Sequence, residues 1–144
     1  MKHAIIEKPD TFHGGRTTIA VDLLVVAREL ADHLPGVWTV TKRSDSEHSH
    51  NHHKTWWLEM ERENDGMRLH FRTDTNYGRS AHISVSMGNY LYATGEMIDA
   101  RWAHNKTGGA KTSARMTVAN TTAKKLAKAI ERRVITPAVP VLAI

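Results

Sequence analysis

The stretch KTWWLEMERENDGMRLHFRTD, residues 54–74, alternates apolar and polar side chains on both sides of an Asp65-Gly66 pair. Such alternation is typical of strands with one buried face, and Asp-Gly favours the positive φ angles of a tight turn. The side chains expected on the buried face are Trp56, Leu58 and Met60 in the first arm and Met67, Leu69 and Phe71 in the second. We therefore predict an antiparallel β-hairpin.

Three further segments have the composition of strands. VWTVTK (37–42) is rich in β-branched and aromatic residues, AHISVSM (81–87) alternates strictly, and RMTVA (115–119) is short and apolar at every second position. The region 88–109 stays open at this point, because NYLYAT can extend the sheet or turn away from it and GEMIDARWAH can form a short helix. These strands predict an antiparallel sheet with one face on the core.

Two amphipathic helices are expected to cover that sheet. Residues 19–34 repeat apolar side chains at three- and four-residue spacing behind Thr17 or Thr18 as N-cap, and the pattern stops at Pro35-Gly36. A second helix is predicted from an Asn120 or Thr121 cap to about Val134. Its expected inward residues are Ala123, Leu126, Ile130 and Val134. The order predicts an α+β fold: four to five antiparallel strands with an N-terminal and a C-terminal helix packed on one face.

Length and composition limit the architecture and the chemistry. A chain of 144 residues with 40% apolar side chains suits a single domain, residues 1–144, with its own core. It contains no cysteine, which excludes disulfides, thiolate catalysis and cysteine-ligated metals. No apolar run approaches the roughly 20 residues that a membrane helix needs. We expect a cytoplasmic protein without a membrane partner.

Positive charge is concentrated in the last third of the chain. Residues 101–144 carry nine Lys or Arg against one Glu, a net charge of +8, whereas residues 1–100 carry eleven against fourteen acidic residues. Such asymmetry is typical of a surface for phosphates, nucleic acid or an acidic protein, although basic helices are also commonly just solvated.

The second helix and the segment before it supply the candidate binding residues. They are Lys124, Lys125, Lys128 and Arg132 on the helix, joined by Lys106, Lys111 and Arg115. Our first hypothesis is a non-enzymatic accessory protein that binds nucleic acid through sequence-nonspecific phosphate contacts. The alternative is an inhibitor or adaptor that binds an acidic surface of a host protein.

The tract HSHNHHK, residues 48–54, raises the question of a metal site. In an extended segment His48, His50 and His52 would point the same way, and neutral imidazole is the commonest metal ligand. The spacing matches no zinc signature, and the neighbouring Ser, Asp and Asn favour a loop. We predict a polar loop between two strands, with no native metal and no cofactor.

Other catalytic patterns are weak. His70 and His82, beside Arg68 and Arg72, are expected on the polar faces of neighbouring strands, where they form a phosphate-binding face, an acid/base pair or a solvated surface. The loop HNKTGGAKTS (104–113) differs from a phosphate-binding loop in having Ala before its second lysine and strand-like residues after it. No nucleophile and base can be paired, so we do not expect an enzyme.

The run AKKLAKAI, residues 123–130, resembles the start of the last helix in double-stranded-RNA-binding domains. In that family a K-K-x-A-K run faces the phosphates across the major groove, and the matching residues here are Lys124, Lys125, Ala127 and Lys128. The resemblance implies recognition of nucleic-acid shape and backbone. The family's glycine-rich turn before this helix is replaced by RMTVANTT, and its Pro-His loop has no counterpart.

The C-terminal third is also similar to small uncharacterised proteins of bacteriophages that infect actinobacteria. The similarity rests on Ser113–Ala119 and Ala127–Pro137. It implies an accessory protein made in the cytoplasm of the infected host, without implying an activity. The final segment ITPAVPVLAI contains two prolines, so we expect an extended apolar tail that docks on the core or mediates a homodimer.

Overall fold

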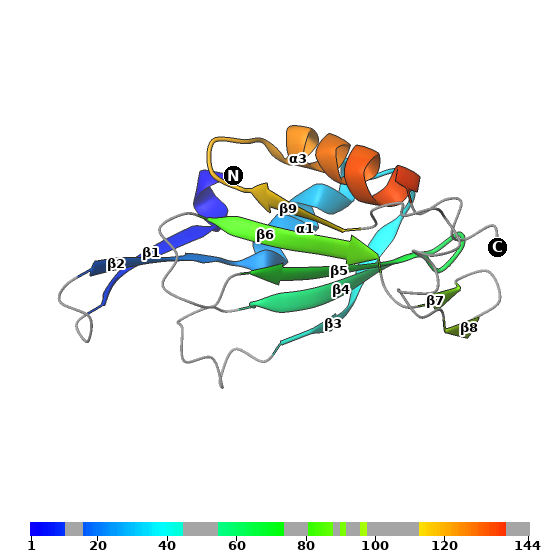
Figure 1. Cartoon of the computed structure of the whole chain (residues 1–144), viewed down its shortest axis with the longest axis horizontal. Helices are drawn as coiled ribbons and strands as arrows, with labels where there is room; N and C mark the ends of the chain where they lie inside the picture. Colours follow the sequence, from blue (N-terminus) through cyan, green and yellow to red (C-terminus); the bar gives the residue numbers. More distant parts are fainter. Residues whose placement is uncertain are drawn as a thin grey trace.

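The computed structural model describes residues 1–10, 16–44, 55–73, 81–87, 90–91, 96–97 and 113–137. A five-stranded antiparallel sheet with the order β3-β4-β5-β6-β9 forms its largest element (Figure 1). The strands are β3 (Trp38–Arg43), β4 (Trp57–Arg62), β5 (Arg68–Thr73), β6 (His82–Met87) and β9 (Ser113–Thr117). With a helix before the sheet and one after it, the chain has the predicted α+β fold.

Two helices lie against this sheet. Helix α1 (Leu23–Ala31) contacts β3, β4 and β5, whereas helix α3 (Ala123–Ile130) contacts α1 and continues into a π-helical turn, η3 (Glu131–Ile135), which contacts β6 and β9. Figure 1 shows α1 behind the strands and α3 above β9. The two helices therefore share the burial of one sheet face, as predicted.

Strict alternation along the strands explains why one face is buried. On β5, Leu69 and Phe71 are fully buried, whereas His70 is half-buried and Arg72 is exposed. The same alternation holds on β4 and β6, so the buried apolar side chains of these strands, among them Leu58, Met60, Ile83 and Val85, lie on the face that the helices cover. The largest fully buried side chains are Phe71, Leu23, Leu30, Leu58, Met60, Met67, Leu69, Ile83, Ile130, Val21, Val26 and Val85.

The central hairpin is present, but its turn is longer than predicted. Strand β4 ends at Arg62 and β5 begins at Arg68, and the Arg62 N–H donates to the Met67 carbonyl at 2.8 Å. Within this turn, residues 63–67, only Gly66 has a positive φ, of 70°. Asp65 instead accepts hydrogen bonds from the Arg62 side chain and the Met67 N–H, and these bonds favour a four-residue loop over a two-residue turn.

The N-terminal region differs from the sequence-based expectation. Strand β2 (Arg16–Val21) pairs with β1 (Ile5–Asp10) in a ribbon that projects from one end of the molecule (Figure 1). Helix α1 therefore starts only at Leu23, and Asp22 is its N-cap, accepting from the Leu24 N–H at 3.2 Å. The predicted Thr17 or Thr18 cap is wrong, because pairing with β1 competes with the helical pattern over the β-branched run RTTIAV.

The second helix also begins later than predicted. Thr122, not Asn120 or Thr121, is the N-cap, and its hydroxyl accepts from the Lys125 N–H at 3.2 Å. Asn120 takes a left-handed conformation, with φ of 57°, in the turn before it. Asn tolerates this conformation better than most residues, which explains its place in the turn rather than at the cap.

The remaining described elements are small. A 3₁₀ turn, η1 (Lys2–Ala4), precedes β1, and β7 (Tyr90–Leu91) pairs with β8 (Glu96–Met97) in a separate two-stranded sheet. Among the described helices, none is long and apolar enough to cross a membrane. The predicted His-rich loop, most of the region 88–112 and the tail after residue 137 lie outside the described residues.

Candidate nucleic-acid interface

Helix α3 carries a cluster of exposed cations on its outward side. Lys124, Lys125 and Lys128 are exposed on the helix, and Arg132 is exposed on η3. We call these four residues the α3 cations. Their spacing of three and four residues places neighbours on one helical surface. Within the part of the chain that the structure describes, none of the four side chains forms an ion pair or a hydrogen bond.

Packing explains why the cations point outward. Leu126, Ala127 and Ile130 are buried on the opposite side of α3 and anchor it to the core. The first turn of the helix contains no acidic residue. Lys124 and Lys125 lie in this first turn, at the positive end of the helix dipole. There a cation lowers the stability of the helix by about 0.3–1 kcal/mol, whereas an anion is favoured. This end of α3 combines backbone N–H groups with two lysines, so its potential favours anions.

The π-helical turn extends this basic surface to the edge of the sheet. Arg133, which the sequence analysis did not single out, donates from Nη1 to the Arg115 carbonyl at 3.5 Å. Val134 and Ile135 on this turn are both buried, and the turn contacts β6 and β9. Their burial fixes the direction in which Arg132 and Arg133 leave the helix.

The sequence-predicted set of cations is only partly brought together. Arg115 lies on β9 between the buried residues Ala114 and Met116, so its side chain belongs to the sheet face opposite α3. Only its backbone carbonyl meets the helix side of the molecule, through Arg133. Lys106 and Lys111 lie outside the described residues. The described basic surface therefore consists of the α3 cations and Arg133.

The sheet face that the helices leave open holds a second group of polar and aromatic side chains. The Trp57 and His70 rings are stacked, with centroids 6.0 Å apart and planes 21° apart. Burial, opposed by Glu59 and assisted by Arg72, lowers the pKa of His70 below its ordinary value. The burial thus disfavours the charged form of His70, and its predicted place on the polar face is confirmed together with that of the half-buried His82.

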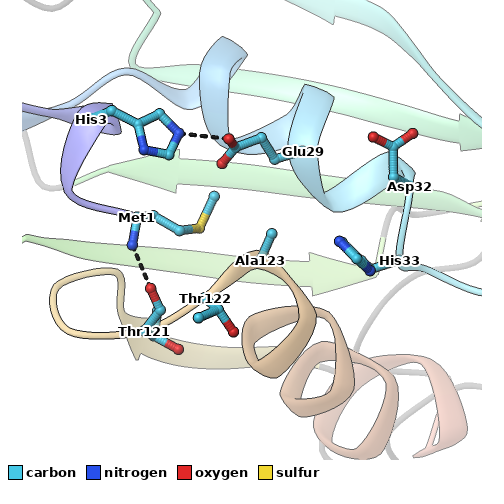
Figure 2. A pocket seen from close by; sticks show the side chains of 8 residues that line it. All are labelled: Met1, His3, Glu29, Asp32, His33, Thr121, Thr122 and Ala123. Carbon is cyan, nitrogen blue, oxygen red and sulfur yellow. Dashed lines mark hydrogen bonds and ion pairs between the residues drawn. The ribbon is translucent and has the colours of Figure 1, made fainter.

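A cavity of about 370 Å³ opens between the end of α1 and the start of α3 (Figure 2). Figure 2 shows the His3 ring and the Glu29 carboxylate pointing at each other, with Nε2 and Oε1 2.6 Å apart. The Met1 ammonium donates to the Thr121 carbonyl on the opposite wall. The lining residues are Met1, His3, Glu29, Asp32, His33, Thr121, Thr122 and Ala123.

The chemistry of this cavity is mixed. Acidic side chains come from Glu29 on α1 and from its C-cap Asp32, whereas the N-terminal amine donates to the Thr121 carbonyl. The histidine and glutamate that meet here are 26 residues apart, with no motif joining them, and the sequence analysis did not detect them. The hydroxyl of Thr122, the N-cap of α3, already accepts a hydrogen bond from the Lys125 N–H. The contacts tie the N-terminal turn to both helices.

Metal-ligating side chains do not gather in the described regions. Over residues 1–10, 16–44, 55–73 and the later described segments, no group of three His, Asp or Glu side chains is placed to hold a metal ion. The candidates His48, His50 and His52 lie outside these segments. The prediction for the His-rich tract therefore stays a prediction.

Comparison of the chain with protein families, with curated proteins and with solved structures finds no match.

Proposed function

We propose that this protein is a non-enzymatic accessory protein that binds nucleic acid through the α3 cations, in a sequence-nonspecific way. The observation that supports it most is the exposure of four cations on one short helical surface without an ionic partner among the described residues. Glu131 is the one acidic residue among residues 123–137, so this segment carries little negative charge of its own. A polyanion would supply the missing counter-charge.

The dimensions of the surface suit a phosphate backbone. From Lys124 to Arg132 the helix rises by about 12 Å, at about 1.5 Å per residue. A major groove of B-DNA is about 12 Å wide, and a duplex carries one charge per roughly 1.7 Å of its axis. The α3 cations can therefore contact several phosphates at once. Each contact releases condensed counterions, which is the main source of nonspecific affinity.

The resemblance of AKKLAKAI to the last helix of double-stranded-RNA-binding domains supports a duplex as the ligand. The lysines that match that family's run, Lys124, Lys125 and Lys128, are exposed, whereas Ala127 is buried. The proposed setting is the cytoplasm, that of an infected host if the similarity to bacteriophage proteins reflects the origin of the chain. A homodimer formed through the apolar tail stays a prediction.

The test is the salt dependence of duplex binding. Lys124, Lys125, Lys128 and Arg132 are replaced together by Gln, which is nearly as good a helix former as Lys. The expected result is weaker binding of duplex DNA and RNA, with a log–log salt slope shallower by up to about 3.6 units on B-DNA. Loss of four α3 charges should leave the folded structure unchanged, as measured by circular dichroism.

A matched control removes exposed cations elsewhere. Lys42 and Arg43 are exposed on β3, at the sheet edge opposite β9, so their replacement by Gln lowers the net charge without touching the α3 cations. We expect the control to change the slope by less than about one unit. If the wild-type protein shows no affinity for any duplex at low salt, the proposal is wrong, and an inhibitor or adaptor that binds an acidic host protein takes its place.

A further inference from the structure

The open sheet face, opposite the helices, presents an aromatic cluster on β4 and β5. The Trp57 ring stacks on His70, and the Trp56 ring meets Trp57 edge to face, with centroids 6.4 Å apart and planes 81° apart. The Arg72 guanidinium lies 5.9 Å from the centroid of Trp56. An imidazole stacked on an indole, with a cation at its side, is a surface that accepts a further aromatic ring.

A row of polar side chains continues from this cluster across the sheet. Arg72 on β5 is paired in register with Ser84 on β6, and Ser84 with Arg115 on β9. All three side chains are exposed. Neighbouring strands lie about 4.8 Å apart, so the two arginines leave backbones about 10 Å apart, with a hydroxyl between them. This spacing lets both guanidinium groups reach one phosphate group or two successive ones.

The charges of this face are arranged unevenly. Its carboxylates, Glu59 and Glu61, are both on β4, and Glu61 forms an ion pair with Arg68, whose Nε lies 3.5 Å from Oε2. Strands β6 and β9 contribute no carboxylate to the face. Two cations therefore lie on the β5–β9 side of this face: Arg72, over the Trp56 ring, and Arg115, two strands further along.

We propose that the open sheet face binds single-stranded nucleic acid, with an unpaired base stacked on the Trp57–His70 pair and its phosphate held between Arg72 and Arg115 over Ser84. Stacking of a base on an aromatic side chain contributes about 1–3 kcal/mol and is tolerant of sequence. The planar guanidinium groups suit phosphate oxygens. An acidic peptide would use the arginines but would leave the aromatic pair without a partner, so a nucleotide fits the whole row better.

This site is distinct from the α3 cations. It lies on the other side of the sheet and would take unpaired bases, whereas the α3 cations are proposed to contact the phosphates of a duplex. The inference therefore goes beyond the proposed function and does not depend on it. Either surface can fail its test while the other passes.

The sharpest test places a negative charge between the two arginines. Ser84→Glu repels a phosphate there, whereas Ser84→Gln adds a side chain of the same size without the charge; both stay on an exposed strand position. With a fluorescent oligothymidylate as probe, we expect Ser84→Glu to weaken binding at least about tenfold and Ser84→Gln to weaken it less than about threefold. Equal affinities for the two variants would overturn the proposal.

A second test separates stacking from charge. Trp57→Leu should weaken oligothymidylate binding by about 5- to 150-fold and remove most of the quenching of tryptophan fluorescence on binding. An abasic oligonucleotide of the same length, which has phosphates but no bases, should bind the wild type and Trp57→Leu equally. If Trp57→Leu and the wild type bind oligothymidylate with the same affinity, no base stacks on this face and the proposal is wrong.

Two further measurements test whether the two surfaces are independent and whether the open face binds an acidic peptide instead. The quadruple Gln variant of the α3 cations should retain oligothymidylate binding, and Ser84→Glu should retain duplex binding, because the two surfaces are independent. Polyglutamate is the competitor for the peptide alternative. If polyglutamate displaces oligothymidylate at equal charge concentration, the face recognises acidic polymers in general, and the assignment to single-stranded nucleic acid falls.

Discussion

Helices α1 and α3 cover the same sheet face, yet their outward surfaces differ. On α1, the N-cap Asp22 lies at the positive end of the helix dipole, and Glu29 is hydrogen-bonded to His3. On α3, two lysines occupy the positive end, and the α3 cations have no ionic partner among the described residues. The inward surfaces are alike, so packing does not require this charge. The difference supports the proposal that the outward side of α3 binds an anionic ligand.

The largest predicted effect concerns the inward surfaces, where the two helices should behave alike. Leu30 on α1 and Ile130 on α3 are both fully buried. Replacing either by Ala should lower the free energy of unfolding by about 2–5 kcal/mol, because it removes apolar contacts and leaves a cavity. Urea denaturation of the two variants measures this. A loss below about 1 kcal/mol for Ile130→Ala would mean that α3 is not part of the core, and the comparison would fail.

A smaller effect on the free energy of unfolding is expected from Asp65, whose partner Arg62 contacts the segment that follows α1. Arg62 donates to the Pro35 carbonyl at 3.4 Å, and its guanidinium lies 5.4 Å from the centroid of the Trp38 ring. Asp65 holds that guanidinium through two hydrogen bonds of 2.9 and 2.6 Å. Asp65→Asn should therefore lower the free energy of unfolding by about 1 kcal/mol, measured in urea at pH 7.

The same pair predicts a pH dependence. The hydrogen bond from Arg62 lowers the pKa of the Asp65 carboxyl below its ordinary value of 3.8, against the opposing effect of burial. A lowered pKa in the folded state means that the stabilisation is present above about pH 4 and is lost as the pH falls through the folded-state pKa. The difference in stability between wild type and Asp65→Asn should thus shrink on acidification. A difference that stays constant from pH 7 to pH 2 would contradict this.

The smallest predicted effect on the free energy of unfolding concerns His3, the partner of Glu29 on α1. The His3 and Glu29 side chains are 59% and 39% exposed, so solvent screens their interaction. His3→Gln should change the free energy of unfolding by less than about 1 kcal/mol and should leave duplex affinity unchanged. Thermal denaturation and a duplex titration check the two parts. A marked loss of duplex binding would place the ligand at the cavity of Figure 2 rather than along the α3 cations.

The sequence predicted correctly those elements whose local periodicity is not overridden by pairing with another part of the chain. Strand β5 alternates without interruption, and the helix around Ile130 repeats its apolar residues at three and four. The helix start at residue 19 was wrong, because the β-branched run 16–21 pairs with a strand that the sequence analysis did not detect. Strand β1 contains Pro9 and lacks alternation, and only its partner makes it a strand.

For the candidate sites, too, the sequence predicts what depends on a local pattern and not what depends on contacts between distant residues. Exposure of the α3 cations follows from helical periodicity, which is local and can be read from the sequence. The contact between Arg133 and the Arg115 carbonyl, the pair of His3 with Glu29, and the stack of Trp57 on His70 depend on strand order and register. Residues 13 to 26 positions apart meet in these contacts, and no local pattern specifies them.

The central claim is that the first turn of α3 carries its lysines for binding and at a cost in stability. The most direct test is the double variant Lys124→Glu/Lys125→Glu, measured for both properties. A glutamate at position 125 would complete a capping box with Thr122, whose hydroxyl already accepts from the backbone N–H of that position.

Urea denaturation of this variant measures its free energy of unfolding, and duplex titration measures its affinity. The account predicts that the free energy of unfolding rises by about 1 kcal/mol, because both charges then suit the helix dipole, while duplex affinity falls more than about tenfold. A variant that is less stable than the wild type, or that binds duplexes equally well, would contradict the account.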